Sequence, residues 1–166
     1  SHMSDQVIIR CADICDDEPD AQVCELMFYD FAKRACFHGE AMTFSTYEDN
    51  KGIREVLARG GNGKVLVVDG RGSQRRALCG GNIAQEAFDH GWAGMVFNGA
   101  VRDTHEFAEL DFGTKALKCT PMRPCTDGIG KADVTLQFGG IVVNPGDYVY
   151  ADFDGVIITK KPIHKA

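Results

Sequence analysis

The sequence lacks any long apolar run. No hydrophobic stretch approaches the roughly 18 residues that a membrane-spanning helix needs, and no signal peptide is visible. Positive charge is also scarce, because 18 Lys and Arg stand against 24 Asp and Glu, for a net charge of −6. No basic stripe offsets this balance, which argues against direct binding of nucleic acid. We therefore expect a cytoplasmic protein with no membrane segment.

Several catalytic motifs are missing as well. No GxGxxG follows a predicted strand, GRGSQRRALCGG does not have the P-loop spacing, and neither HExxH nor GxSxG occurs. These absences argue against nucleotide enzymes, zincins and serine hydrolases. The 7 cysteines include no CxxC pair, so we expect reduced thiols rather than a disulfide scaffold or a zinc ribbon. Cys11 and Cys15, spaced i, i+4 on a predicted helix, leave a metal pair open as an alternative.

With 166 residues, 44% of them hydrophobic, the chain can form one domain with a substantial core. Ser1, His2 and Met3 look like the remnant of an expression tag, so we expect the domain to span residues 4–166. We expect one or two helices over Ile8–Cys36, then strands and helices over 39–44, 50–60, 64–70, 82–90, 93–97 and 103–110. After Thr114, turn residues separate short predicted strands over 117–120, 134–138, 141–143, 148–151 and 156–159. An α/β first half and a β-rich C-terminal layer favour a β/β/α sandwich over a Rossmann fold.

The residues that can carry chemistry gather between Cys79 and Phe112. Gly80-Gly81-Asn82 precedes a predicted helix, so free backbone N–H groups can point outward there and bind an anion. Arg102 and Asp103 stand between a predicted strand and the next helix, the usual place for sites in α/β sheets. We therefore expect a guanidinium, a carboxylate and backbone amides to converge on one small acidic ligand.

Each candidate residue also has a structural interpretation. The planar fork of Arg102 fits a carboxylate, or it forms an ion pair with Asp103, Glu106 or Glu109. Asp103 can hold a hard cation such as Mg²⁺ through oxygen, or it stabilises the first turn of a helix. Glu106 shares that helix face and can support metal-bound water, or it is a solvated glutamate. The Gly80-Gly81 pair also serves as a plain turn.

Several separated blocks of the chain resemble the RraA family, whose namesake is a regulator of ribonuclease activity. They are TYEDN, KVLVVDGRGSQRRAL, GWAGMVFNGAVRD and DGIGKADVTLQFGGIVVNPGDYVYADFDGVIIT. Together they cover the chain from about Cys11 to Thr159. The resemblance implies a single RraA-like domain with the β/β/α sandwich of the swivelling-domain type. It also implies a homotrimeric ring, sometimes paired into a hexamer, with clefts between subunits.

The family includes 4-hydroxy-4-methyl-2-oxoglutarate (HMG) aldolases, which are metal-dependent, release pyruvate from HMG and decarboxylate oxaloacetate. By this resemblance Arg102 binds the substrate and Asp103 holds the metal. The substrate carboxylate would lie on the backbone amides of Gly80, Gly81, Asn82 and Ile83. Gly81 stands where those aldolases have an Asp, which removes an expected organiser of the water that acts as acid or base. Glu106, three residues after Asp103, remains as a second carboxylate.

We therefore expect a Mg²⁺- or Mn²⁺-dependent aldolase or decarboxylase of 2-oxo acids such as oxaloacetate, with Arg102 and Asp103 as catalytic residues. The alternative is a non-enzymatic regulator that binds and inhibits ribonuclease E or an associated RNA helicase. The family's namesake lacks an Asp at the position of Asp103, so its presence here favours chemistry. A third interpretation is an inactive trimeric scaffold in which Arg102 braces a subunit contact. A methyltransferase label used in the family gains no support, because no S-adenosylmethionine-binding glycine motif is present.

Overall fold

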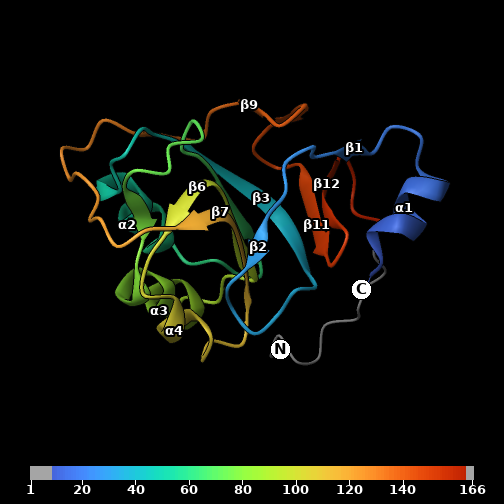
Figure 1. Ribbon diagram of the computed structural model, residues 1–166. Coiled ribbons are helices and arrows are strands. Elements are labelled where there is room, and N and C mark those ends of the chain that lie inside the picture. Colours follow the sequence, from blue (N-terminus) through green and yellow to red (C-terminus); the bar gives the residue numbers. More distant parts are fainter. Residues whose placement is uncertain (1–8, 164–166) are drawn as a thin grey trace.

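The structure, a computed structural model, describes residues 9–163 (Figure 1). Its helices are α1 (Cys11–Asp17), α2 (Lys51–Leu57), α3 (Gly81–Asp89) and α4 (Thr104–Phe107). Its strands are β1 (Gln22–Val23), β2 (Tyr29–Asp30), β3 (Phe37–Ser45), β4 (Val65–Asp69), β5 (Ala77–Cys79), β6 (Gly94–Val101), β7 (Gly113–Cys119), β8 (Lys131–Ala132), β9 (Leu136–Phe138), β10 (Ile141–Val143), β11 (Tyr148–Asp152) and β12 (Gly155–Thr159). The residues that we assigned to a tag, 1–3, lie outside the described part.

Four parallel strands form the middle of the molecule, in the order β3-β4-β6-β7. The β-branched run of β4 predicts a buried strand, and its first four residues are buried. Because side chains alternate along a strand, Leu66 and Val68 enter one hydrophobic cluster while Val65 and Val67 enter another. Both faces of this sheet are therefore covered.

The C-terminal strands cover one face. β3 belongs to two layers, since its residues 37–40 pair antiparallel with β11 while residues 41–45 pair parallel with β4. The β11–β12 hairpin then lies back over the parallel strands, and its inner side chains pack with Val65 and Val67; they are Val149, Ala151, Val156 and Ile158. The predicted β-rich C-terminal layer is confirmed.

Helices α2, α3 and α4 cover the opposite face (Figure 1). In α2, the spacing of Ile53, Val56 and Leu57 places all three on one buried side. Trp92 is buried beside them and its Nε1 donates to the Leu57 carbonyl oxygen at 3.1 Å, which fixes the end of α2 against the start of β6. The layers are thus helix, parallel sheet and antiparallel hairpin, so the predicted β/β/α sandwich is confirmed.

The prediction of helices over Ile8–Cys36 is wrong beyond Asp17; Ile8 itself lies outside the described residues. Pro19 follows α1 closely, and Val23 then pairs with Ile157 as an edge strand. Tyr29 pairs with Ala116 at the other edge. The helical spacing of apolar residues in this segment is coincidental, because the backbone hydrogen bonds are satisfied by the sheet edges instead.

Other differences are smaller. β5 and β8 were not predicted, β6 continues to Val101 rather than ending at Phe97, and the helix predicted over 103–110 is the single turn α4. Within the described part of the chain, no helix combines the length and the hydropathy that a bilayer crossing requires.

Candidate active site

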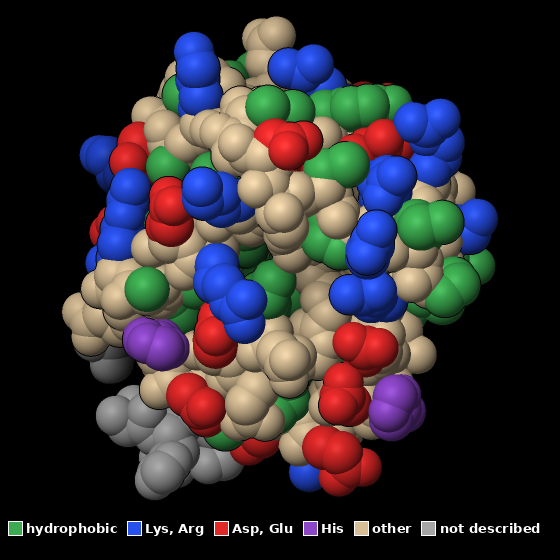
Figure 2. Space-filling model, turned by 90° about the vertical axis from the view of Figure 1, so that its left-hand side faces the viewer, with side chains coloured by type: hydrophobic (Ala, Val, Ile, Leu, Met, Phe, Trp, Pro, Cys, Tyr) green, Lys and Arg blue, Asp and Glu red, His purple; other side chains and the backbone are tan. Residues whose placement is uncertain are grey.

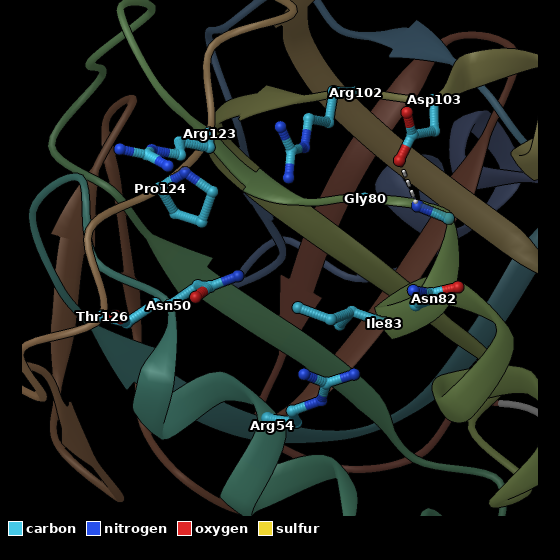
Figure 3. A pocket seen from close by; sticks show the side chains of 11 residues that line it. Asn50, Arg54, Gly80, Asn82, Ile83, Arg102, Asp103, Arg123, Pro124 and Thr126 are labelled. Atoms are coloured by element: carbon cyan, nitrogen blue, oxygen red, sulfur yellow. Dashed lines mark hydrogen bonds between the residues drawn. The ribbon is translucent and has the colours of Figure 1, made fainter.

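The first wall of the candidate site is the start of α3. Gly80 is the N-cap of α3, and the N–H groups of Asn82 and Ile83 have no acceptor among the described residues. These amides line a cavity of about 280 Å³ (Figure 3). The Gly81 N–H is used differently, because it donates to Asp103 Oδ2 at 3.0 Å. Two of the predicted amide donors therefore remain open for a ligand, while a third holds a side chain.

The second wall is the turn between β6 and α4. The Arg102 N–H donates to the Cys79 carbonyl oxygen at 2.9 Å, which sets this turn beside the start of α3. Asp103 has φ 59° and ψ 44°, in the left-handed region that Asp tolerates better than most residues. This conformation directs the Asp103 carboxylate back over the glycine turn. A Cβ added to Gly80 would lie 2.8 Å from Asp103 Oδ2.

Glu106 approaches the same glycines. A Cβ added to Gly81 would lie 1.8 Å from Glu106 Oε2, so the Glu106 carboxylate occupies the space of a side chain at position 81. Within the described residues neither Asp103 nor Glu106 forms an ion pair. Two unpaired carboxylates over one glycine turn offer only oxygen ligands, which suits a hard cation such as Mg²⁺. The described chain contains no cluster of three or more metal-ligating side chains, so water and substrate oxygens would complete the shell.

Arg102 does not form the ion pair that we considered as its structural role. In the described part of the chain its guanidinium makes one hydrogen bond, from Nη1 to the Pro121 carbonyl oxygen at 3.4 Å. Figure 3 shows the rest of the group extending into the cavity. The guanidinium is therefore available to an anionic ligand.

Comparison with known proteins shows which family the chain belongs to. The chain matches the family model RraA-like, described as Aldolase/RraA, over residues 11–158. It belongs to the RraA-like family. A protein of Alkalilimnicola ehrlichii, named "Putative 4-hydroxy-4-methyl-2-oxoglutarate aldolase", is 46% identical over 159 residues, covering 95% of this chain and 99% of that protein. A protein of a Marinomonas species with the same name is 43% identical over 152 residues, covering 91% and 94%.

Two solved structures have this RraA-like fold at a TM-score of 0.92. The RNA-processing inhibitor RraA from Thermus thermophilis is 41% identical, and the match covers 96% of this chain and 98% of that one. A protein of Geobacillus kaustophilus, described as S-adenosylmethionine: 2-dimethylmenaquinone methyltransferase, is 42% identical, and the match covers 93% and 97%. The names of these relatives differ in function, while the fold is shared.

The far wall of the cavity was not predicted from the sequence. It consists of Asn50, Arg54, Arg123, Pro124 and Thr126. TYEDN, one of the blocks that resemble the RraA family, contains Asn50, but no local pattern points to the others. Figure 2 shows the side of the molecule that is on the left in Figure 1, where Lys and Arg side chains gather around a hollow. An anion approaching there meets positive charge although the whole chain carries −6.

Two buried acidic residues hold this far wall in place. The Asp49 carboxylate accepts hydrogen bonds from the N–H groups of Lys51 (3.2 Å) and Gly128 (3.0 and 3.1 Å). Glu48 accepts from Ser73 and twice from the Arg75 guanidinium, at 2.9 Å each. These hydrogen bonds, Arg75 first, lower the pKa of Glu48 to about 2. The segment that carries Arg123 to Thr126 is thus bound to the turn between β3 and α2.

Proposed function

We propose that this protein is a divalent-metal-dependent lyase that cleaves carbon–carbon bonds in 2-oxo acids. HMG cleavage to pyruvate and oxaloacetate decarboxylation are the reactions that we assign to it. One observation carries the proposal: the guanidinium of Arg102, which has no carboxylate partner among the described residues, meets the open amides of α3 and the Asp103 carboxylate at one cavity. The aldolase names of relatives more than 40% identical support the reaction class.

The chain's own groups suit the head of a 2-oxo acid. The N–H groups of Asn82 and Ile83 bind the first carboxylate, and the charge of Arg102 strengthens that binding. When the carbon–carbon bond breaks, oxaloacetate releases its distal carboxylate as CO₂, whereas the 4-hydroxyl of HMG loses its proton to water and becomes the keto group of a second pyruvate. In both reactions the electron pair of the broken bond moves onto the 2-oxo group and an enolate of pyruvate forms. Arg102 stabilises this developing negative charge, which existed only weakly in the substrate. Because no lysine lies among the described lining residues, we infer no Schiff base.

Asp103, with Glu106 beside it, would hold Mg²⁺ or Mn²⁺. When bound, such an ion polarises the 2-oxo group as a Lewis acid, a contribution of several kcal/mol to the transition state. The Gly81 N–H keeps the Asp103 carboxylate oriented. Glu106 lies where a side chain at position 81 would be, so it is the chain's nearest replacement for the acid that the aldolases carry there. Through a water molecule, Glu106 can deliver the proton that converts the terminal carbon of the enolate into the methyl group of pyruvate.

The test is pyruvate release from oxaloacetate with Mg²⁺ or Mn²⁺, with and without a chelator. We expect chelator-sensitive turnover in the wild type and none in Asp103→Ala. Asp103→Asn is the better folding control, because Asn also tolerates the left-handed conformation and keeps an oxygen for the Gly81 N–H. Asp89→Ala removes an exposed carboxylate at the other end of α3 and should leave turnover unchanged. Turnover that survives in both Asp103 variants would overturn the proposal.

A second candidate function is inhibition of ribonuclease E, or of an associated helicase, by protein–protein contact. The structural match to an RNA-processing inhibitor favours it. Titrating the protein into a ribonuclease E cleavage assay separates the two functions, since inhibition without chelator-sensitive pyruvate release supports the regulator. We further propose a homotrimer or a paired hexamer, which light scattering of the purified protein measures.

A further inference from the structure

Asn50 is a buried polar side chain without a partner. Only 8% of its surface is exposed, and within the described chain its side-chain amide makes no hydrogen bond. Figure 3 shows that amide pointing into the cavity, on the side away from Asp103. The amide is not among the described side-chain atoms that are both fully buried and unpartnered, so it can be reached from the cavity and its hydrogen-bonding groups are open to a ligand.

The missing hydrogen bond of Asn50 is unusual for its position in the chain. It is the N-cap of α2, where an Asn side chain normally accepts a hydrogen bond from the first turn. No such bond is present. Asp49 Oδ1 instead accepts the N–H of Lys51 at 3.2 Å. The turn is thus capped by the preceding residue, and the amide of Asn50 is left free.

Arg54 lies one turn further along α2 and lines the same cavity. Its Nε and Nη2 pair with the Glu86 carboxylate at 3.1–3.2 Å, which fixes the guanidinium at the rim. Nη1 has no partner among the described residues. In Figure 3 Arg54 and Arg102 approach the cavity from opposite sides, with Asn50 between them on the left. The cavity therefore presents two separate groups of donors.

We propose that Asn50 and Arg54 form a subsite for the distal carboxylate of a 2-oxo dicarboxylate. This inference rests on the proposed function, in which Arg102 and the α3 amides take the carboxylate next to the 2-oxo group. The cavity volume of about 280 Å³ is just below the roughly 300–1,000 Å³ of drug-sized pockets, which suits a short acid. The two residues thus select dicarboxylates over monocarboxylates.

The test compares the affinities of two unreactive ligands by titration calorimetry in the presence of Mg²⁺. Pyruvate has only the 2-oxo acid head, whereas 2-oxoglutarate adds a distal carboxylate and has no 4-hydroxyl to support cleavage. Asn50→Ala and Arg54→Ala should each weaken 2-oxoglutarate binding roughly tenfold to a hundredfold, as expected for a lost hydrogen bond to a charged group. Pyruvate affinity should change less than about twofold to threefold, because its contacts are at the other end.

Two further variants separate recognition from packing. Arg59→Ala removes another half-exposed arginine just beyond α2, paired with Asp133, and should leave both affinities unchanged. Glu86→Gln weakens the ion pair with Arg54 but keeps the Arg54 guanidinium. It should therefore reduce the affinity for 2-oxoglutarate far less than Arg54→Ala does. The proposed subsite would be rejected if the variants lost affinity for both ligands equally, or if the wild type bound both ligands with equal affinity. Selective binding without any pyruvate release from oxaloacetate would leave the subsite standing and reject the proposed chemistry.

Discussion

Two adjacent glycines decide what the candidate site can contain. Side chains at Gly80 and Gly81 would meet the carboxylates of Asp103 and Glu106, so their absence lets both carboxylates reach the same turn. Asp103 accepts a left-handed conformation to do so, which costs on the order of 1–3 kcal/mol. Among the described residues no Lys or Arg side chain pairs with the Asp103 carboxylate, so this conformation serves to present the carboxylate at the cavity.

We predict that Gly81→Ala reduces turnover while the protein stays folded. The new Cβ would lie 1.8 Å from Glu106 Oε2, and Glu106 is a flexible side chain that can turn away. We expect the free energy of unfolding to fall by no more than about 1–3 kcal/mol. Pyruvate release from oxaloacetate, measured beside urea unfolding, checks both parts.

The matched background for this test is Glu106→Ala, which has no carboxylate for the new Cβ at position 81 to meet. If Gly81→Ala acts by displacing Glu106, adding it to Glu106→Ala should cause little further loss of activity. Additive losses in this double-mutant cycle would show that the two residues act independently.

At the scale of elements, the cavity is a junction between segments far apart in the chain. The turn before α2 faces the start of α3, and the segment around Cys125 bridges to Asp49. Buried Asp49 organises this junction through backbone N–H groups on both sides. The far wall of the cavity therefore depends in part on the Asp49 carboxylate, although Asp49 does not itself line the cavity.

We predict that Asp49→Ala loosens the segment 121–130 without unfolding the sheet. The N–H groups of Asp127 and Gly128 lose their acceptor, and the free energy of unfolding should fall by about 1–3 kcal/mol. Hydrogen exchange should accelerate in this segment and remain slow in β4 and β6. Asp127→Ala is the control, because it removes an exposed side chain and keeps the N–H. A uniform increase in exchange would contradict the local role.

Features set by a short local segment could be predicted from the sequence, whereas features set by contacts between distant segments could not. The strand over 64–70 was predicted because its β-branched residues form one local run. The turn at Gly80 and the turn at Arg102 were expected to converge because both lie in one short segment, but the Gly81 N–H, expected to bind the ligand, donates to Asp103 instead. The segment holding Val23 was predicted wrongly, since its helical spacing competes with pairing to β12, a strand more than 130 residues away. Asn50 and Arg54 were missed for the same reason: what they face is decided by long-range packing.

At the scale of the whole molecule, stability in acid depends on carboxylates that are paired in the folded state. The pKa of Glu48 lies at about 2 instead of 4.5, chiefly because Arg75 and Ser73 hydrogen-bond its charged form. A lowered pKa adds stability above the unfolded value, and this contribution is lost as the pH falls from about 4.5 towards 2.

We predict that Glu48→Gln lowers the free energy of unfolding by about 1.5–3 kcal/mol at pH 7. The difference from the wild type should shrink as the pH falls through this window, because protonation removes the same charge. Urea unfolding at several pH values measures the difference. Asp133→Asn, which breaks the exposed pair with Arg59, should keep the wild-type pH dependence. A difference that stays constant down to the lowest pH would show that Glu48 contributes no charge-dependent stability.

The strand shared by both layers has a mechanical consequence. Because β3 pairs with β11 through residues 37–40 and with β4 through residues 41–45, one unbroken strand joins the hairpin to the parallel sheet. Any change in the angle between the hairpin and the sheet therefore has to bend β3, and Asn50 lies in the turn that follows this strand.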